Sequence, residues 1–316
     1  MQRPGPGQRM YQERHIPPLP GYGIIYGNAA GCRRGGESMA DYGIGPEDYM
    51  EPRCLLCDEP YGTAPEIKAV PQKRIAEKLD AYMAKKDYKG AERHLLYWLE
   101  EARLGRDLRG ELMVRGELIG HYRKTGNREG ALENVDRVLS LLKEMDFEDS
   151  ISAGTAFVNA ATALNAFGEN ERSLELFEKA RKIYEASPRT DLSLLGGLYN
   201  NMALTCSALG RYDEALALYE KAVSVMRKVP GGHLEEAITC LNMADTLEKQ
   251  GGMEENEKRI FSLLDRALDL LKEQGEAPAG YFAFVLEKCA PAFSYYGYFA
   301  AAQELSEKAE KIYAGT

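Results

Sequence analysis

One motif recurs along the chain at intervals of about forty residues, and this repetition limits the possible folds more than any other feature. The segment at 208–222, ALGRYDEALALYEKA, has a counterpart at 166–180, AFGENERSLELFEKA. A turn residue recurs at Lys86, Gly126, Gly168, Gly210, Gly251 and Gly297, with successive spacings of 40, 42, 42, 41 and 46 residues. Self-similarity at a fixed period predicts a stack of supersecondary units, each of which contacts only its neighbours.

Each unit has the pattern of two antiparallel helices. From about residue 66, apolar residues fall at i, i+3, i+4 and i+7, which is typical of amphipathic helices. A small residue follows most of the turn residues by five positions: Ala91, Ala131, Ser173, Ala215 and Ala302. Two helices joined by a tight turn approach closely only where small side chains meet. Glycine allows the left-handed backbone that ends the first helix. We therefore predict an all-α fold of about six hairpins, or twelve helices, over 66–316.

Three units depart from the pattern. The first, 66–105, lacks the turn glycine and has Trp98 where a small residue is usual. In the fifth, the segment 253–257 is consistent with an extra helical turn. The sixth carries Pro291 inside its first helix, which predicts either a kink or a delayed start of that helix.

Residues 1–65 have a different character from the rest. They hold 9 of the 14 Pro, 11 of the 31 Gly and six Tyr, and they show no helical period. Such a segment buries too little apolar surface to offset its chain entropy, so we predict a disordered tail. The alternative is a segment that docks on a partner or on its own chain. A separate hypothesis makes residues 1–38 a translated leader, with Met39 as the start of the native protein.

Composition excludes several classes of function. The formal net charge is −9, whereas binding to nucleic acid needs clustered Lys and Arg. No run of about 18 apolar residues is present, and the N-terminus lacks the apolar region of a secretory signal. We therefore expect no nucleic-acid partner, no membrane span and a cytoplasmic location.

No motif in the chain predicts catalysis. The four His residues are never at helical metal-ligand spacing, and neither a phosphate-binding loop nor a dinucleotide-binding fingerprint occurs. We expect a protein that is not an enzyme and has no cofactor. Cys54 and Cys57 are the one pair with metal or redox spacing, but no second pair lies near them to complete a zinc site. A metal role is therefore the weaker hypothesis, and a linker the stronger one.

The turn, small and bulky residues of the repeat resemble the tetratricopeptide repeat family over residues 70–316. The usual period of that family is about 34 residues. The longer period here is similar to the variant found in kinesin light chains and in bacterial scaffold proteins, as are the segments 198–203 and 232–244. The resemblance implies a right-handed α-solenoid whose concave groove, made by the first helix of each hairpin, holds a peptide or a segment of a protein partner.

Alignment on the turn residue puts Asn159, Asn201 and Asn242 at the same position of three successive first helices. An amide both donates and accepts hydrogen bonds, so a row of Asn side chains can hold the backbone of an extended peptide. The resemblance implies this role for the three residues and for the adjacent Asn200. The alternative is that each Asn bonds only to the neighbouring hairpin.

Charged residues flank this row. Arg123 and Lys124 end one first helix, and Asp245 and Glu248 take comparable places in a later one. A groove that is basic at one end and acidic at the other would orient a bound peptide. The alternative is an ordinary solvated helix face.

The last repeat is rich in aromatic residues, most of which we expect in the core. A surplus of exposed rings would allow self-association through this end of the array. The leading hypothesis for function is a scaffold that binds a peptide or protein partner. The alternative is a peptide-sensing regulator or adaptor whose own tail, 1–65, occupies the groove until it is displaced.

Overall fold

The computed structural model describes residues 67–315, except for the side chains of Gly252 and Met253. The predicted tail, the leader hypothesis and the Cys54–Cys57 pair lie outside the described residues. The helices are α1 (Gln72–Ala84), α2 (Tyr88–Leu104), α3 (Leu108–Thr125), α4 (Arg128–Glu144), α5 (Ile151–Ala166), α6 (Asn170–Ala186), α7 (Leu192–Ala208), α8 (Tyr212–Met226), α9 (His233–Leu270), α10 (Ala279–Tyr295) and α11 (Phe299–Ala314). No strand occurs between residues 67 and 315.

The 38-residue segment α9 is itself a hairpin. Arg266 Nε donates a hydrogen bond to Glu236 Oε1 at 3.2 Å, although these residues would lie about 45 Å apart along a straight helix. Asn256 Nδ2 donates to the carbonyl of Leu247 at 3.0 Å, which places the reversal between them. The two arms of α9 therefore run antiparallel, and twelve helical arms result, as predicted.

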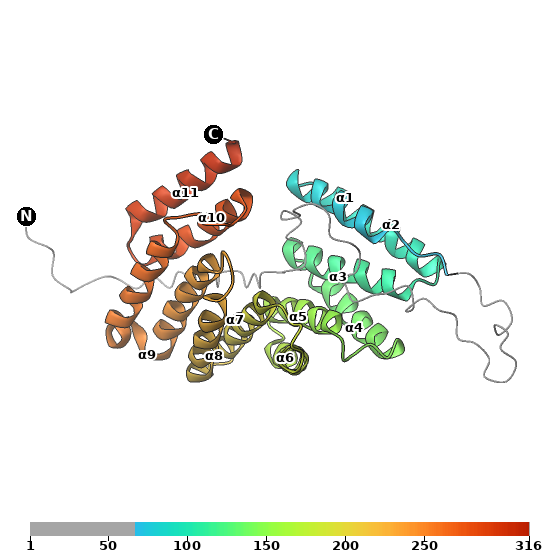
Figure 1. Cartoon of the computed structure of the whole chain (residues 1–316), viewed down its shortest axis with the longest axis horizontal. Coiled ribbons are helices and arrows are strands. Elements are labelled where there is room, and N and C mark those ends of the chain that lie inside the picture. Colours follow the sequence, from blue (N-terminus) through green and yellow to red (C-terminus); the bar gives the residue numbers. More distant parts are fainter. Residues whose placement is uncertain (1–66, 316) are drawn as a thin grey trace, which may run out of the picture.

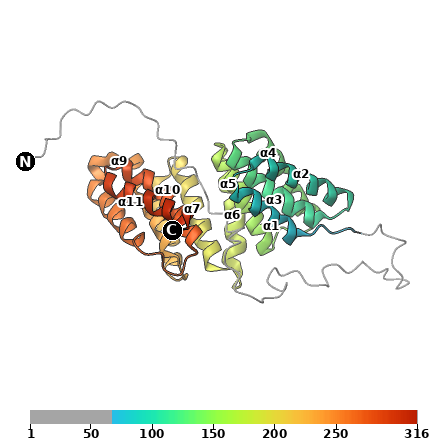
Figure 2. The ribbon, with the colours of Figure 1, turned by 90° about the horizontal axis from the view of Figure 1, so that it is seen from above.

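Pairing of consecutive helices gives six hairpins, which we number along the chain. They are α1–α2, α3–α4, α5–α6, α7–α8, the two arms of α9, and α10–α11. Figure 1 shows them stacked into an arch in which α1, α3, α5, α7 and α10 lie on the inside and their partner helices outside. First helices of successive hairpins contact one another, for example α3 with α5 and α5 with α7. Seen from above, α1 to α4 occupy one end of the long axis and α9 to α11 the other (Figure 2).

The turn residues behave as predicted at five of the six positions. Lys86, Gly126, Gly168, Gly210 and Gly297 all have positive φ, from 55° to 86°. Gly251 is the exception and the prediction for it is wrong, because it lies within the helical part of α9. The extra helical turn expected in this repeat carries the chain around the reversal without a left-handed residue.

The small residues of the repeat lie where the two helices of a hairpin meet. Ala91, Ala131, Ser173 and Ala215 are fully buried, and Ala302 is 8% exposed. Ser173 satisfies its hydroxyl by donating to the carbonyl of Ala161 at 2.8 Å. A larger side chain at any of these places would push the two helices apart.

Helix starts follow from local sequence. Asp87, Asp107 and Asn127 each accept a hydrogen bond from the backbone N–H three residues later, which caps α2, α3 and α4. The last repeat also forms a regular hairpin. Its first helix, α10, begins at Ala279 and continues through Pro291, so a delayed start is excluded. Between residues 67 and 315, no helix combines the length and the apolar composition needed to cross a bilayer.

Candidate functional site

The inside of the arch carries a small depression at the seam between α5 and α7. Asn159 of α5 and Asn201 of α7 both line it, together with Thr155, Tyr184 and Leu194. Its cavity volume is about 10 Å³, enough for about one water molecule. Two of the three predicted Asn residues therefore meet at one place, although they are 42 positions apart in the sequence.

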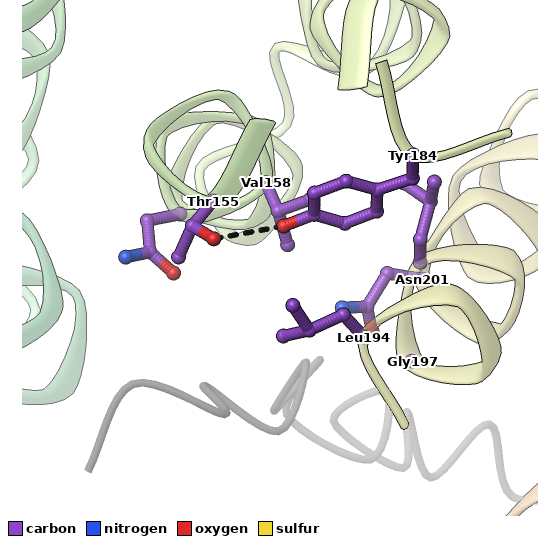
Figure 3. A pocket seen from close by; sticks show the side chains of 8 residues that line it. Thr155, Val158, Tyr184, Leu194, Gly197 and Asn201 are labelled. Atoms are coloured by element: carbon purple, nitrogen blue, oxygen red, sulfur yellow. Dashed lines mark hydrogen bonds between the residues drawn. The ribbon is translucent and has the colours of Figure 1, made fainter. Parts of the chain in front are cut away.

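The Tyr184 ring forms the roof of this depression. It extends from α6 over the Asn201 side chain, and its hydroxyl lies 2.9 Å from Thr155 Oγ1 (Figure 3). A Cβ at Gly154 would lie 2.5 Å from the ring, so glycine at that position lets Tyr184 rest against α5. Burial raises the pKa of Tyr184 to about 12, so the hydroxyl stays protonated at neutral pH. The residues that line the depression are therefore uncharged.

Asn201 and Asn159 differ from the other predicted Asn residues because their side-chain amides make no hydrogen bond within residues 67–315. Asn201 is only 4% exposed, yet within residues 67–315 its side chain makes no hydrogen bond. The Asn159 side chain is half-buried and likewise makes none within that range. Neither amide is among the fully buried polar atoms that lack a hydrogen-bond partner, so both can exchange solvent for the N–H and C=O groups of a ligand.

Asn200 and Asn242 behave differently. Asn242 Nδ2 donates to Asn200 Oδ1 at 3.2 Å, and Thr239 Oγ1 donates to the same oxygen at 3.2 Å. These bonds link α7 to α9. The interpretation that an Asn bonds only to the neighbouring hairpin therefore describes this pair, whereas Asn159 and Asn201 face the depression.

The two basic residues predicted to flank the groove, Arg123 and Lys124, have different surroundings. The Lys124 ammonium lies 5.4 Å from the centre of the Tyr88 ring, which turns it toward hairpin 1. Arg123 is half-buried, and its positive charge is one of the influences that lower the pKa of Lys288 in α10. The two basic residues therefore have different neighbours.

The predicted acidic residues are engaged within the chain. Asp245 accepts a hydrogen bond from Lys249 at 2.7 Å. Glu248 accepts one from the hydroxyl of Tyr295 at 2.7 Å and one from that of Tyr296 at 2.8 Å. Glu248 therefore links α9 to α10, and its expected place in a groove stays a prediction.

Three charged residues at the same offset were missed from the sequence. Asn159, Asn201 and Asn242 each precede their turn residue by nine positions, and the same offset gives Glu77 in α1, Glu117 in α3 and Lys288 in α10. The signal was available, since Lys86, Gly126 and Gly297 were already recognised as turn residues. A search for a repeated Asn overlooked the positions where a charge replaces it.

A separate charged cluster is structural. Glu236, 2% exposed, accepts hydrogen bonds from Arg227 at 2.7 Å and from Arg266 at 3.2 Å. Burial alone would raise the pKa of Glu236, but the bonds and charges of the two Arg residues outweigh it and hold the pKa below its ordinary value. The cluster joins α8 to both arms of α9.

The aromatic rings of the last repeat divide between core and surface. Phe282 and Phe293 are buried, whereas Tyr295 and Phe299 are 51% and 69% exposed. The exposed rings are compatible with self-association through this end, which stays a prediction. No group of three or more His, Cys, Asp or Glu residues in the described part of the chain is arranged to hold a metal ion.

Residues 194–273 match the family model of the tetratricopeptide repeat. This range spans hairpins 4 and 5, and the hairpins on either side have the same helix–turn–helix organisation. None of the curated proteins matches the sequence.

Solved structures resemble the chain at low sequence identity. The nearly identical kinesin-light-chain TPR-like repeats of Podosopora anserina are 22% identical, with a TM-score of 0.46, over 65% of this chain and 95% of that one. BtubC of P. vanneervenii is 16% identical, with a TM-score of 0.45, over 78% of this chain and 92% of that one. NprR, in complex with its cognate peptide NprX, is 15% identical, with a TM-score of 0.51, over 77% of this chain and 68% of that one. Residues 194–273 are therefore assigned to the tetratricopeptide repeat family, and the stacked hairpins give residues 67–315 the fold of an α-solenoid.

Proposed function

We propose that this protein is a non-enzymatic scaffold that binds an extended peptide, or an extended segment of a protein partner, along the inside of its arch. The observation that carries the proposal is the pair of amides at the α5–α7 seam. Asn159 and Asn201 line one depression, and neither side chain is bonded within residues 67–315. An extended backbone offers the N–H and C=O groups that such amides match.

The bonded Asn pair supports the same reading. Asn200 and Asn242 hold α7 against α9, which fixes the spacing of the first helices on the inside of the arch. Rigid helices position the unbonded amides before a ligand arrives, and this lowers the entropic cost of binding. The structure of NprR was determined with a peptide bound, and a peptide ligand is what we propose here.

Selection from a library of random peptides tests the proposal. The full chain is compared with the Asn159→Ala/Asn201→Ala variant, and affinities of enriched peptides are measured by fluorescence anisotropy. We expect the double variant to bind about thirtyfold more weakly, because its two lost bond sets contribute about 1 kcal/mol each. Asn170→Ala is the matched control, since Asn170 begins the outer helix α6 and bonds Asn165.

Two outcomes would overturn the proposal. Either no peptide is enriched on the full chain, or the double variant binds as well as the wild type while circular dichroism shows both folded. The same assay separates the regulatory alternative. Deletion of residues 1–65 should raise the affinity for an added peptide only if the tail competes with that peptide for the groove. We place this activity in the cytoplasm.

A further inference from the structure

Exposed apolar side chains gather at the end of the solenoid where α1 and α2 lie (Figure 1). Of the ten large apolar side chains exposed within residues 67–315, five lie between residues 67 and 108. Four of these flank the α2–α3 turn or lie on the α2 face that leads to it, and we name them the entry patch: Ile67, Tyr97, Leu104 and Leu108. Leu104 is 72% exposed. Apolar groups clustered in this way mark a contact surface.

The described chain begins at this patch. The backbone N–H of Lys68 donates to the carbonyl of Gly105 at 2.9 Å. The backbone N–H of Val70 donates to Asp107 Oδ2, also at 2.9 Å. These two bonds lay residues 68–70 along the α2–α3 turn, so the chain enters the solenoid beside the entry patch.

Two glycines make room for the entering chain. A Cβ at Gly105 would lie 2.3 Å from the carbonyl oxygen of Lys68, and one at Gly110 would lie 2.5 Å from Val70 Cγ2. Val70 is buried as a result of this close approach. The residues that precede Ile67 therefore leave from a fixed point on the surface.

The preceding chain is long enough to cover the patch. The large apolar residues nearest to Ile67 on that side are Tyr61 and the adjacent pair Leu55 and Leu56. Eleven residues of extended chain, from position 56 to position 67, reach up to about 36 Å. The seven residues from Tyr97 to Leu104 rise only about 10 Å along α2. The segment 54–61 therefore reaches every part of the patch.

Charge complements this apolar match. Lys68 and Arg106 are exposed beside the turn, and neither makes an ion pair within residues 67–315. Asp58 and Glu59 lie in the middle of the segment 54–61. Exposed ion pairs add little affinity, but they favour one orientation of a segment over the reverse.

We propose that residues 54–61 pack on the entry patch, with Leu55 and Leu56 against Tyr97 and Leu104, and so cap the first hairpin. The terminal repeat of a solenoid has no neighbour on its outer side, and a covering segment keeps that end soluble. The occupant is thus a named part of this chain, and the inference does not depend on the proposed function.

The single Trp of the chain reports on the patch. Trp98 is half-buried, and its ring centre lies 5.2 Å from that of Tyr97. In the full chain, we expect Leu55→Ser/Leu56→Ser to raise the acrylamide quenching constant of Trp98 about twofold, because these two side chains supply most of the apolar cover. Ile24→Ser/Ile25→Ser is the matched control, since it removes similar apolar bulk far along the chain from Ile67, and it should leave quenching unchanged.

A variant of the patch itself checks the other side of the contact. Leu104→Ser should raise quenching to a similar extent, and it should add little when combined with the Leu55→Ser/Leu56→Ser change, because both remove one contact. Leu192→Ser, at the start of α7, alters an exposed Leu elsewhere and is the control.

Thiol labelling gives an independent readout. In the wild type, Cys54 and Cys57 should react with a maleimide about tenfold more slowly than Cys32, because only the first two lie in the docked segment. Leu104→Ser should bring the three rates together. Peptide mass mapping after short exposure measures each rate.

Three results would overturn the inference. Quenching could stay unchanged in both Leu variants while circular dichroism shows them folded, or the three thiols could react equally in the wild type. Quenching could also depend on protein concentration while light scattering reports a dimer, which would make a second copy the occupant. None of these measurements uses a peptide ligand, so the proposed function stands or falls separately.

Discussion

Two seams of the same solenoid use their polar groups in opposite ways. At the α5–α7 seam, the Asn159 and Asn201 side chains make no hydrogen bond within residues 67–315. At the α9–α10 seam, Tyr295 and Tyr296 donate to Glu248 at 2.7 and 2.8 Å, and the Tyr281 hydroxyl donates to Glu235. One seam keeps its hydrogen-bonding capacity open, whereas the other uses it to join neighbouring hairpins.

The difference teaches how a repeat position acquires a role. Equivalent positions of a solenoid face the same surface, but whether a side chain is available depends on what the next hairpin presents to it. Thr239 and Asn242 donate hydrogen bonds to the side-chain oxygen of Asn200, so the Asn200 amide helps to hold α7 against α9. At the α5–α7 depression, hairpin 3 presents Thr155, whose hydroxyl pairs with Tyr184 and not with Asn201. Whether an Asn side chain can bond a ligand therefore depends on two neighbouring hairpins and not on one repeat alone.

The largest expected effect comes from the apolar cores beneath the two seams. Phe157→Ala in α5 removes a ring that is 2% exposed and should cost about 3–5 kcal/mol of folding free energy. Because each repeat contacts only its neighbours, hydrogen exchange should accelerate in hairpins 2 to 4 more than in hairpin 6. Phe293→Ala in α10 is the matched control, and it should show the reverse distribution. A uniform loss of protection in both variants would contradict this view.

A smaller effect should follow from opening the α9–α10 seam. Glu248→Ala leaves the hydroxyl of Tyr296, which is 9% exposed, without its acceptor. We expect a loss of about 1–3 kcal/mol in thermal or denaturant unfolding. Glu248→Ala combined with Tyr296→Phe should recover part of that loss, because no buried hydroxyl is then left unpaired. An unchanged melting temperature for the single variant would mean that the seam does not depend on these bonds.

Acid should weaken the contact between hairpins 4 and 5 before it affects the uncharged α5–α7 seam. The pKa of Glu236 in the folded protein lies below its ordinary value of 4.5, since Arg227 and Arg266 outweigh the effect of burial. Its stabilising contribution is therefore present above the unfolded pKa and is lost as pH falls through the folded pKa. We expect a loss on the order of 1 kcal/mol, or about 2–4 °C in melting temperature, below pH 4.5.

Glu236→Gln provides the control for this pH dependence. The variant should start from a lower stability at pH 7 and fall less steeply with acid than the wild type. Parallel pH profiles for the two proteins would show that other carboxylates govern the acid response.

The smallest effect on stability should come from the seam proposed to bind peptide. Asn201→Ala removes an amide that bonds nothing within residues 67–315, so folding free energy should change by less than about 0.5 kcal/mol. Asn242→Ala breaks the bond to Asn200 and should cost more, about 1 kcal/mol. If the two variants lose equal stability, the distinction between open and occupied Asn residues is wrong.

Much of the fold could be predicted because its determinants are local. Gly168 and Gly210 end first helices with positive φ, and Ala131 and Ala215 are fully buried between the helices of their hairpins. These features depend on residues within one repeat. Gly251 was the failure, because the continuous helical assignment of α9 depends on the chain around 253–257, which no other repeat shares.

The candidate site was only partly predictable. The common offset from the turn residue placed Asn159 and Asn201 at one seam, as the depression they share demonstrates. The partners of Asn242 and Glu248 could not be inferred, because they come from the preceding or the following hairpin and depend on how far each hairpin rotates on its neighbour.

By itself, the sequence determined the helical hairpins, their number and the residues on their inner helices, since period, turn and side-chain size act over one repeat. Only the tertiary structure decided which polar groups make no hydrogen bond and which bond to a neighbouring hairpin. The physical reason is that small rotations between packed hairpins accumulate along a solenoid, so its curvature belongs to the whole array rather than to any one repeat.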